Sequence, residues 1–367
     1  MRTAALAIGA GLIATILWDA FETVVLPRSV SRRLRLTAAY YRMTWRPWAA
    51  MARWFDSDAR RERFLAIYGP MSLIGLSVVW ALGLLLGFAV VHWGFGSKLL
   101  VQETGPTRFV DDLYMSGTTL FTLGLGDVLP SAGIARGLTV IEAGLGFAFL
   151  AIVIAYLPVL YQSFAKREVR LTLLDAWAGS PPAGAEVLLR LARAGDLDAL
   201  DGFLKDWEYW CSEVLESHIS YPATAYFRSQ HQRQSWVSAL STVLDVSALV
   251  AVGIDRIPRW QARVTFAIAR HTVVDLTQVL HARAEMNVDR LSGEALERLR
   301  RDLENVGLRP DRSPEAEAEL TRLRRSYEPY ILGLAKRLMM PASEWRHETS
   351  SRDNWQTSPK GDGGGHI

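Results

Sequence analysis

Long runs of apolar residues, separated by charged segments, dominate the first 165 residues of the chain. A helix needs about 20 apolar residues to cross about 30 Å of hydrocarbon. Residues 67–93 hold no Asp, Glu, Lys or Arg, and residues 134–161 hold only Arg136 and Glu142. Both runs are therefore predicted to be transmembrane helices.

A third apolar run lies within residues 1–27 and contains the acidic residues Asp19 and Glu22. A cleaved signal peptide is the alternative, but Trp18, Asp19 and Phe21 spoil the small-residue cleavage site that such a peptide needs. We therefore predict an N-terminal transmembrane helix that stays in the protein. Its two carboxylates are expected to pair with the arginines just after it.

The segment 28–66 is rich in arginine and aromatic residues, and its arginines far outnumber its acidic residues. Positively charged loops stay on the cytoplasmic side of a membrane. This bias predicts an N-terminus outside the cell membrane and a cytoplasmic chain after residue 166. Two interpretations of the segment stay open, a helix lying on the inner membrane surface and a solvated loop whose charges only set the topology.

A shorter helix is predicted between the second and third spans. Thr107, Asp111 and Asp112 suit the N-terminus of a helix that runs to about residue 120. This helix is too short to cross a bilayer, and a glycine-containing loop follows it. Non-helical backbone at membrane depth is tolerated only where protein buries it or where it lines water. We therefore predict a re-entrant pore helix and loop over residues 107–127.

The loop contains the stretch Thr119-Leu120-Phe121-Thr122-Leu123-Gly124-Leu125-Gly126-Asp127. It resembles the T-x-x-T-x-G-x-G-D signature of potassium channels. The order of outer helix, pore helix, signature and inner helix is also that of the family's pore module, and the resemblance covers about residues 67–161. It implies a homotetramer in the lipid bilayer whose four loops bind potassium ions in a selectivity filter.

In such a filter, rings of backbone carbonyls replace the hydration shell of the ion. Successive carbonyls face one axis only if the backbone conformation alternates, and glycine reaches the necessary positive φ at little cost. The ion-binding residues are expected to be Thr122, Leu123, Gly124, Leu125, Gly126 and Asp127. Support for the filter is expected from Thr118, Thr119, Tyr114 and Glu142.

Two leucines depart from the usual sequence of the family. Leu123 and Leu125 stand where Val and then Tyr or Phe are usual, and Tyr114 and Met115 replace paired tryptophans. We expect a cation channel that prefers potassium over sodium. The alternatives are a nonselective cation pore and a membrane-anchored enzyme or receptor whose activity lies in the cytoplasmic helices.

The third span carries further candidate residues. Glu142 either lines the pore as a cation-attracting ring or braces the filter by bonding Thr118, Tyr114 or the pore-helix backbone. We favour the brace because buried polar groups require partners. A hinge and a proline-kinked gate are predicted at Gly146, Tyr156 and Pro158. The alternative to a gate is a plain helix end at the membrane surface.

The rest of the chain reads as a helical cytoplasmic domain, residues 166–345, followed by a tail, residues 346–367, that is disordered by composition. Within the domain, residues 235–253 are predicted to form a core helix and residues 259–287 a long helix. The chain is thus predicted to be an all-α membrane protein. It combines three transmembrane helices, a re-entrant pore helix with its filter loop, and an α-helical cytoplasmic domain.

Other chemistry is weakly indicated. The pairs His271–Asp275 and His281–Glu285 have the spacing of metal ligands on a helix, but we favour ordinary surface pairs. No nucleotide-binding glycine motif or P-loop occurs, which speaks against the nucleotide-binding regulatory domains that often follow such pores. As a channel, the chain is not expected to be an enzyme, and no cofactor is expected apart from potassium ions in the filter. The single Cys211 excludes an intrachain disulfide, and a net charge of +3 argues against a nucleic-acid partner.

Overall fold

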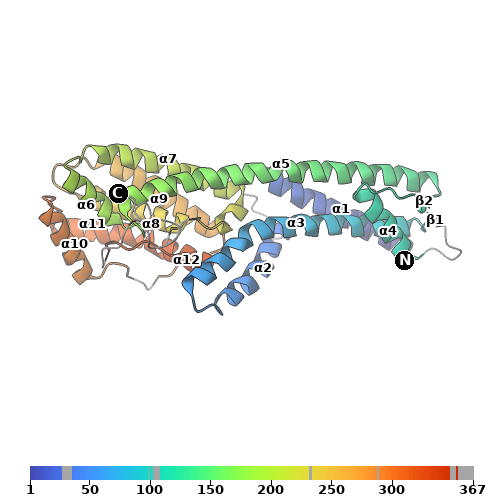
Figure 1. The fold of residues 1–367 in the computed structure, drawn as a ribbon, viewed down its shortest axis with the longest axis horizontal. Coiled ribbons are helices and arrows are strands. Elements are labelled where there is room, and N and C mark those ends of the chain that lie inside the picture. The colour runs from blue at the N-terminus through green and yellow to red at the C-terminus, as the bar shows by residue number, and fades with distance from the viewer. Residues whose placement is uncertain are drawn as a thin grey trace, which may run out of the picture. The chain divides into compact units, whose positions relative to one another are not determined.

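The computed structural model describes residues 1–26, 35–97, 99–101, 108–230, 234–286, 289–347 and 353. The chain divides into two compact units, Met1–Tyr161 and Gln162–Ile367, both built mainly from helices (Figure 1). Three helices are long and apolar enough to cross a membrane, α1 (Arg2–Val24), α3 (Asp58–Gly94) and α5 (Gly133–Ala178). The predicted all-α fold with three spans is therefore confirmed.

The first helix packs along the second span, α1 against α3 (Figure 1). Asp19 is buried in this interface, where its carboxylate accepts hydrogen bonds from Trp80 Nε1 at 2.9 Å and from Thr37 Oγ1 at 2.6 Å. Glu22 Oε2 lies 3.7 Å from Arg35 Nε. Of the two carboxylates, Glu22 thus has the expected arginine partner, whereas Asp19 links α1 to Thr37 and α3.

Part of the arginine-rich segment forms a helix, α2 (Leu36–Ala52), that packs against α3. The ring centroids of Trp45 and Tyr68 are 4.8 Å apart, and Trp48 stacks on Phe64 at 4.5 Å. These aromatic side chains contact α3 and leave the opposite side of α2 exposed. Residues 36–52 are therefore a helix and not a solvated loop, while the place of this helix on the inner membrane surface stays a prediction.

Two spans extend beyond their predicted ends. The outer helix α3 begins at Asp58 instead of residue 67, and the inner helix α5 continues to Ala178 instead of ending at residue 161. Hydropathy marks only where the apolar run stops, whereas these extensions are stabilised by packing, on α2 in the first case. In the second case, Leu171 and Leu174 are buried although charged residues surround them in sequence.

The unit after Tyr161 contains, besides the end of α5, a set of shorter helices. They are α6 (Gly184–Ala194), α7 (Ala199–Ser220), the 3₁₀ helix η1 (Pro222–Tyr226), α8 (Trp236–Val252), α9 (Trp260–Val279), α10 (Gly293–Asn305), α11 (Pro314–Arg325) and α12 (Glu328–Leu338).

Helix α8 forms the centre of this unit, because all of its residues except Val252 are buried. The core helix expected over residues 235–253 is therefore confirmed. The long helix expected over residues 259–287 is wrong, since α9 ends at Val279. The chain turns there, and His281 takes a positive φ of 50° that no helix continues through.

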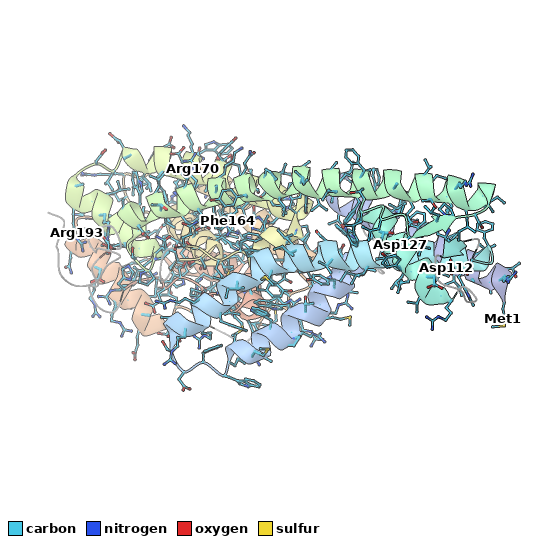
Figure 2. All side chains as sticks on the ribbon, turned by 45° about the vertical axis from the view of Figure 1, so that its right-hand side comes forward. Met1, Asp112, Asp127, Phe164, Arg170 and Arg193 are labelled. Carbon is cyan, nitrogen blue, oxygen red and sulfur yellow. The ribbon has the colours of Figure 1, made fainter. Side chains whose placement is uncertain are left out.

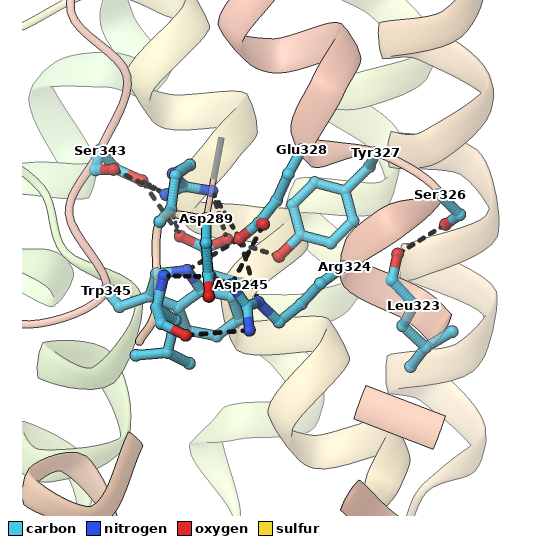
Figure 3. Close-up of polar contacts among 11 residues, drawn as sticks. Asp245, Asp289, Leu323, Arg324, Ser326, Tyr327, Glu328, Ser343 and Trp345 are labelled. Carbon is cyan, nitrogen blue, oxygen red and sulfur yellow. Dashed lines mark hydrogen bonds and ion pairs between the residues drawn. The ribbon is translucent and has the colours of Figure 1, made fainter. Parts of the chain in front are cut away.

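A buried ionic network surrounds Asp245 of α8 (Figure 3). Arg290 donates to both of its carboxylate oxygens, at 3.1 and 2.7 Å, and the Tyr327 hydroxyl donates at 2.7 Å. The Ser343 hydroxyl adds a fourth hydrogen bond at 3.2 Å. Every buried polar atom of the Asp245 carboxylate thus has partners, which is the condition for burying a charge in a core.

The same network also binds the segment after α12, through hydrogen bonds from Ser343 and Trp345. Glu328 receives hydrogen bonds from Arg324, at 3.2 Å to each oxygen, and from Trp345 Nε1 at 3.1 Å (Figure 3). Further along, Asp353 lies 2.9 Å from Arg190 NH2. The other residues of the predicted tail beyond residue 347 lie outside the described residues.

Candidate ion pore

The predicted re-entrant helix is α4 (Phe109–Leu120), which packs against α3 (Figure 1). The backbone N–H of Arg108 donates to Asp111 Oδ2 at 2.7 Å and so satisfies one free amide at the start of the helix. Thr107, the expected first residue, lies outside the described residues. With 12 residues, α4 is far too short to cross a bilayer.

The loop after α4 has an alternating backbone. Thr122, Gly124 and Gly126 have φ of 59°, 55° and 81°, and the residues between them do not have positive φ. A Cβ added to Gly124 or Gly126 would meet nothing within 4 Å in one chain. Conformation and not space therefore requires glycine at these two positions, as the filter hypothesis expects. Thr122 takes the same strained conformation with a side chain.

Hydrogen bonds fix the inner end of this loop to the pore helix. The carbonyl oxygen of Thr118 accepts the backbone N–H groups of Leu123 at 2.7 Å and of Gly124 at 3.2 Å. The N–H of Thr122 donates to the carbonyl of Thr119 at 3.0 Å. Thr118 and Thr119 thus support the loop through their backbone, while the Thr118 hydroxyl donates to the carbonyl of Met115 at 3.0 Å.

The outer end of the loop is tied to the pore helix by side chains. The Tyr114 hydroxyl donates to Asp127 Oδ2 at 2.8 Å, and Asp127 Oδ1 accepts the N–H of Val128 at 3.1 Å. Figure 2 shows Asp127 beside α4. The structure therefore brings together two residues, Tyr114 and Asp127, that were predicted to have separate roles in support and in ion binding.

A short β-ladder follows the loop. Strand β2 (Val128–Pro130) pairs antiparallel with β1 (Leu99–Val101), with Leu100 opposite Leu129. The pairing joins the exit of the loop to the chain that leaves α3. Arg136 Nε also donates to the carbonyl of Pro130 at 3.3 Å. Strands of three residues give no periodic signal in the sequence, which explains why they were not predicted.

Glu142 is fully buried and is paired with a residue that the sequence did not suggest. Its Oε2 atom lies 3.3 Å from Nε2 of His92, which is 2% exposed and lies near the end of α3. The expected partners have other contacts, since the hydroxyl groups of Thr118 and Tyr114 bond Met115 and Asp127. The pair connects the outer helix α3 directly to the inner helix α5.

Polar side chains of the pore helix complete this site. Asp112 is buried and accepts a hydrogen bond from Ser97 Oγ at 2.6 Å, and Ser116, one turn further along α4, is buried as well. We call this group the polar brace, and its members are His92, Ser97, Asp112, Ser116 and Glu142. The His92–Glu142 pair links α3 to α5, and the Ser97–Asp112 hydrogen bond links the chain just after α3 to α4, in surroundings where an unpaired charge is costly.

Gly146 lies where the inner helix crosses the end of the pore helix. A Cβ at this position would lie 2.2 Å from the carbonyl oxygen of Leu120, so any larger residue collides with backbone. The residue predicted to be a hinge therefore has a packing role in this structure. Tyr156 and Pro158 lie inside the continuous α5, so the alternative of a plain helix end at Pro158 is wrong.

The four candidate metal ligands do not converge. His271 Nε2 lies 3.5 Å from Asp275 Oδ2, as an ordinary surface pair on α9. His281 lies beyond the end of α9, and Glu285 Oε1 bonds Lys336 Nζ at 2.7 Å. Across the residues that the structure describes, no group of three or more His, Cys, Asp or Glu side chains can hold a metal ion.

Comparison with known proteins agrees with this geometry. Residues 77–162, which include about half of α3, all of α4 and the loop, and much of α5, match the protein-family model described as "Ion channel". This segment is an ion channel domain. The match is consistent with a two-helix pore module of the potassium-channel type, and the apolar helices make the chain a membrane protein.

Three curated relatives match parts of the chain. The uncharacterized membrane protein YdjJ of Bacillus subtilis (strain 168) is 23% identical over 52% of this chain and 56% of its own length. Protein LctB of Bacillus caldotenax is 32% identical, and that of Geobacillus stearothermophilus 33%, each over 21% of this chain and 63% of its own length. The chain thus spans less than two thirds of the length of each. No solved structure matches it.

Proposed function

We propose that this chain is one subunit of a homotetrameric channel that conducts potassium ions through the loop Thr122–Asp127. The observation that carries the proposal is the alternation of positive φ at Thr122, Gly124 and Gly126 within a segment that matches ion channels. One chain contributes one such loop, whereas a ring of carbonyls around an ion needs four. Four copies around one axis would supply successive rings for dehydrated cations.

Preference for potassium over sodium is supported by the two anchors of the loop. The Thr118 carbonyl holds its inner end, and the Tyr114–Asp127 hydrogen bond holds its outer end. A loop fixed at both ends keeps the spacing of its carbonyls, which favours one size of cation. On this reasoning, Leu123 and Leu125 do not remove selectivity, since their side chains take no part in either anchor.

For orientation, we propose an N-terminus outside the cell membrane and a cytoplasmic unit after Tyr161. The support is the excess of arginine between α1 and α3, because positively charged loops remain in the cytoplasm. The short ladder of β1 and β2 and the Tyr114–Asp127 hydrogen bond then lie at the extracellular mouth.

The test is a reversal-potential measurement on purified protein in liposomes, with potassium on one side and sodium on the other. We expect a value close to the potassium equilibrium potential. A value near zero with clear currents would leave only the nonselective cation pore. No current from any preparation, together with a dimeric particle, would favour the alternative of a membrane-anchored enzyme or receptor.

Glycine variants connect the current to the loop. Gly124→Ala and Gly126→Ala should each abolish selective flux, because alanine resists the positive φ of these positions. Gly202→Ala is the matched control, since Gly202 lies in α7 with open space around it and without positive φ. Unchanged flux in both filter variants would remove the filter assignment.

A further inference from the structure

The end of α5 after Tyr161 has two opposite faces. One face is buried within the C-terminal unit and comprises Phe164, Arg167, Leu171, Leu174 and Ala178. These residues recur every three or four positions, as the contact face of a helix does. Figure 2 shows Phe164 and Arg170 along this part of the helix.

The other face is exposed and has the same spacing. It comprises Gln162, Lys166, Val169, Leu173 and Ala176, and we call it the α5 stripe. Val169 is 61% exposed and Leu173 52% exposed, and neither packs into the described part of its own unit. Intervals of four, three, four and three residues average 3.5, which is the repeat of a coiled-coil seam.

The stripe cannot turn inward, because the buried face is firmly held. The Arg167 guanidinium is buried and donates to the carbonyls of Thr224 at 3.1 Å and Phe227 at 2.8 Å. Its NH1 atom also lies 3.2 Å from Nε2 of His218. Rotating α5 to cover Val169 and Leu173 would break these contacts. The carbonyls of Thr224 and Phe227 would then lose the Arg167 guanidinium that donates to them.

We propose that the α5 stripe packs against the same stripe of other copies of this chain, as a parallel helical bundle that continues the inner helices. The inference rests on the proposed tetramer. Since α5 is one unbroken helix from Gly133 to Ala178, symmetric copies around a pore would present their stripes in parallel and at one height. A parallel coiled coil requires this arrangement, with identical residues meeting in each layer.

The residue types favour another copy of the chain over lipid as the occupant. Val169 and Leu173 supply two adjacent apolar layers, and Ala176 allows close approach of the helices below them. Lys166 and Gln162 supply polar layers above, and a lysine or other polar residue in a seam selects register and number of strands at some cost in stability. A lipid-facing helix would not carry a lysine in the middle of its apolar face.

Site-directed crosslinking tests the stripe in the intact protein. Cys211 is the single cysteine of the chain and is fully buried, and burial raises the pKa of its thiol, so it is inert to maleimides. Val169→Cys and Leu173→Cys would each add one reactive thiol on the stripe. Thr172→Cys is the control, since Thr172 is also exposed but lies off the stripe.

With a short bis-maleimide in membranes, we expect both stripe variants to form covalent dimers at a yield several-fold above that of Thr172→Cys. Equal yields at all three positions, or crosslinking confined to Thr172→Cys, would overturn the inference. Leu173→Asp should in addition lower the fraction of tetramer in detergent several-fold while the circular dichroism spectrum stays unchanged. A fully retained tetramer in that variant would also count against the stripe.

These experiments can show separately whether the helical bundle is wrong or the proposed channel function is wrong. A selective tetrameric channel whose stripe variants do not crosslink would refute the bundle alone. Efficient crosslinking of a protein that is already dimeric before crosslinking, and that shows no ion flux, would instead refute the tetrameric channel on which the bundle rests.

Discussion

The polar brace makes a quantitative prediction for Glu142. Glu142→Gln keeps the size of the side chain but replaces the carboxyl group, whose Oε2 atom lies 3.3 Å from His92 Nε2, by an amide. Both side chains are almost wholly inaccessible, at 0% and 2% exposure. Leaving a buried polar group without its partner costs about 1–3 kcal/mol, so we expect a clear loss of stability of the folded protein.

A double-mutant cycle separates the pair from its surroundings. The stabilities of Glu142→Gln, His92→Gln and the double variant would be measured by thermal unfolding in detergent, followed by their ion flux in liposomes. Contacting residues typically show coupling of about 0.5–3 kcal/mol, and we expect the double variant to be less destabilised than the sum of the single ones. Glu294→Gln, at a side chain 90% exposed, is the matched control.

Two results would refute this reasoning. Additive effects of the two substitutions would mean that His92 and Glu142 do not act as a pair. A normal stability for Glu142→Gln combined with a reduced single-channel conductance would mean that the carboxylate lines the pore as a ring of charge.

Three further predictions follow from single contacts. Gly146→Ala should destabilise the protein in thermal unfolding by about 1–3 kcal/mol, because its Cβ would collide with Leu120, and an unchanged melting temperature would contradict the packing. Tyr114→Phe should lower potassium-over-sodium selectivity by freeing Asp127, measured as a shift of the reversal potential; an unshifted value would exclude this anchor. Burial and the nearby Arg167 hold the pKa of His218 well below 6.5. His218 therefore binds a proton in the unfolded state at a pH where it stays neutral in the folded state. The free energy of unfolding should therefore fall as pH drops below 6.5, by at most about 1.4 kcal/mol per pH unit, and His218→Phe should flatten that slope.

The sequence was informative where a local rule decides the structure. Apolar runs indicated the three spans, and the brevity of the segment around Asp111 indicated a helix that enters the membrane without crossing it. Alternate glycines predicted the alternating backbone at Gly124 and Gly126. The positive φ of Thr122 was not predicted, because threonine adopts it only when its neighbours impose it.

Contacts between residues far apart in the chain could not be predicted from local sequence patterns. Nothing in the local sequence of His92 indicates that it meets Glu142. The end of α9 at Val279 was missed for a related reason. The segment after it remains compatible with a helix in composition, and tertiary contacts such as Lys336 with Glu285 determine its path instead.

The network around Asp245 has a consequence for biogenesis. Ser343 and Trp345 supply partners to carboxylates near the centre of the C-terminal unit, and the N–H of Ala185 donates to the carbonyl of Trp345 at 3.0 Å. A nascent chain that has not yet reached these residues holds Asp245 and Glu328 with incomplete partners. The transmembrane helices are made much earlier, so they insert while this unit is still unfinished. A ribosome stalled before residue 343 should therefore display an inserted pore module attached to a protease-sensitive, unclosed C-terminal unit.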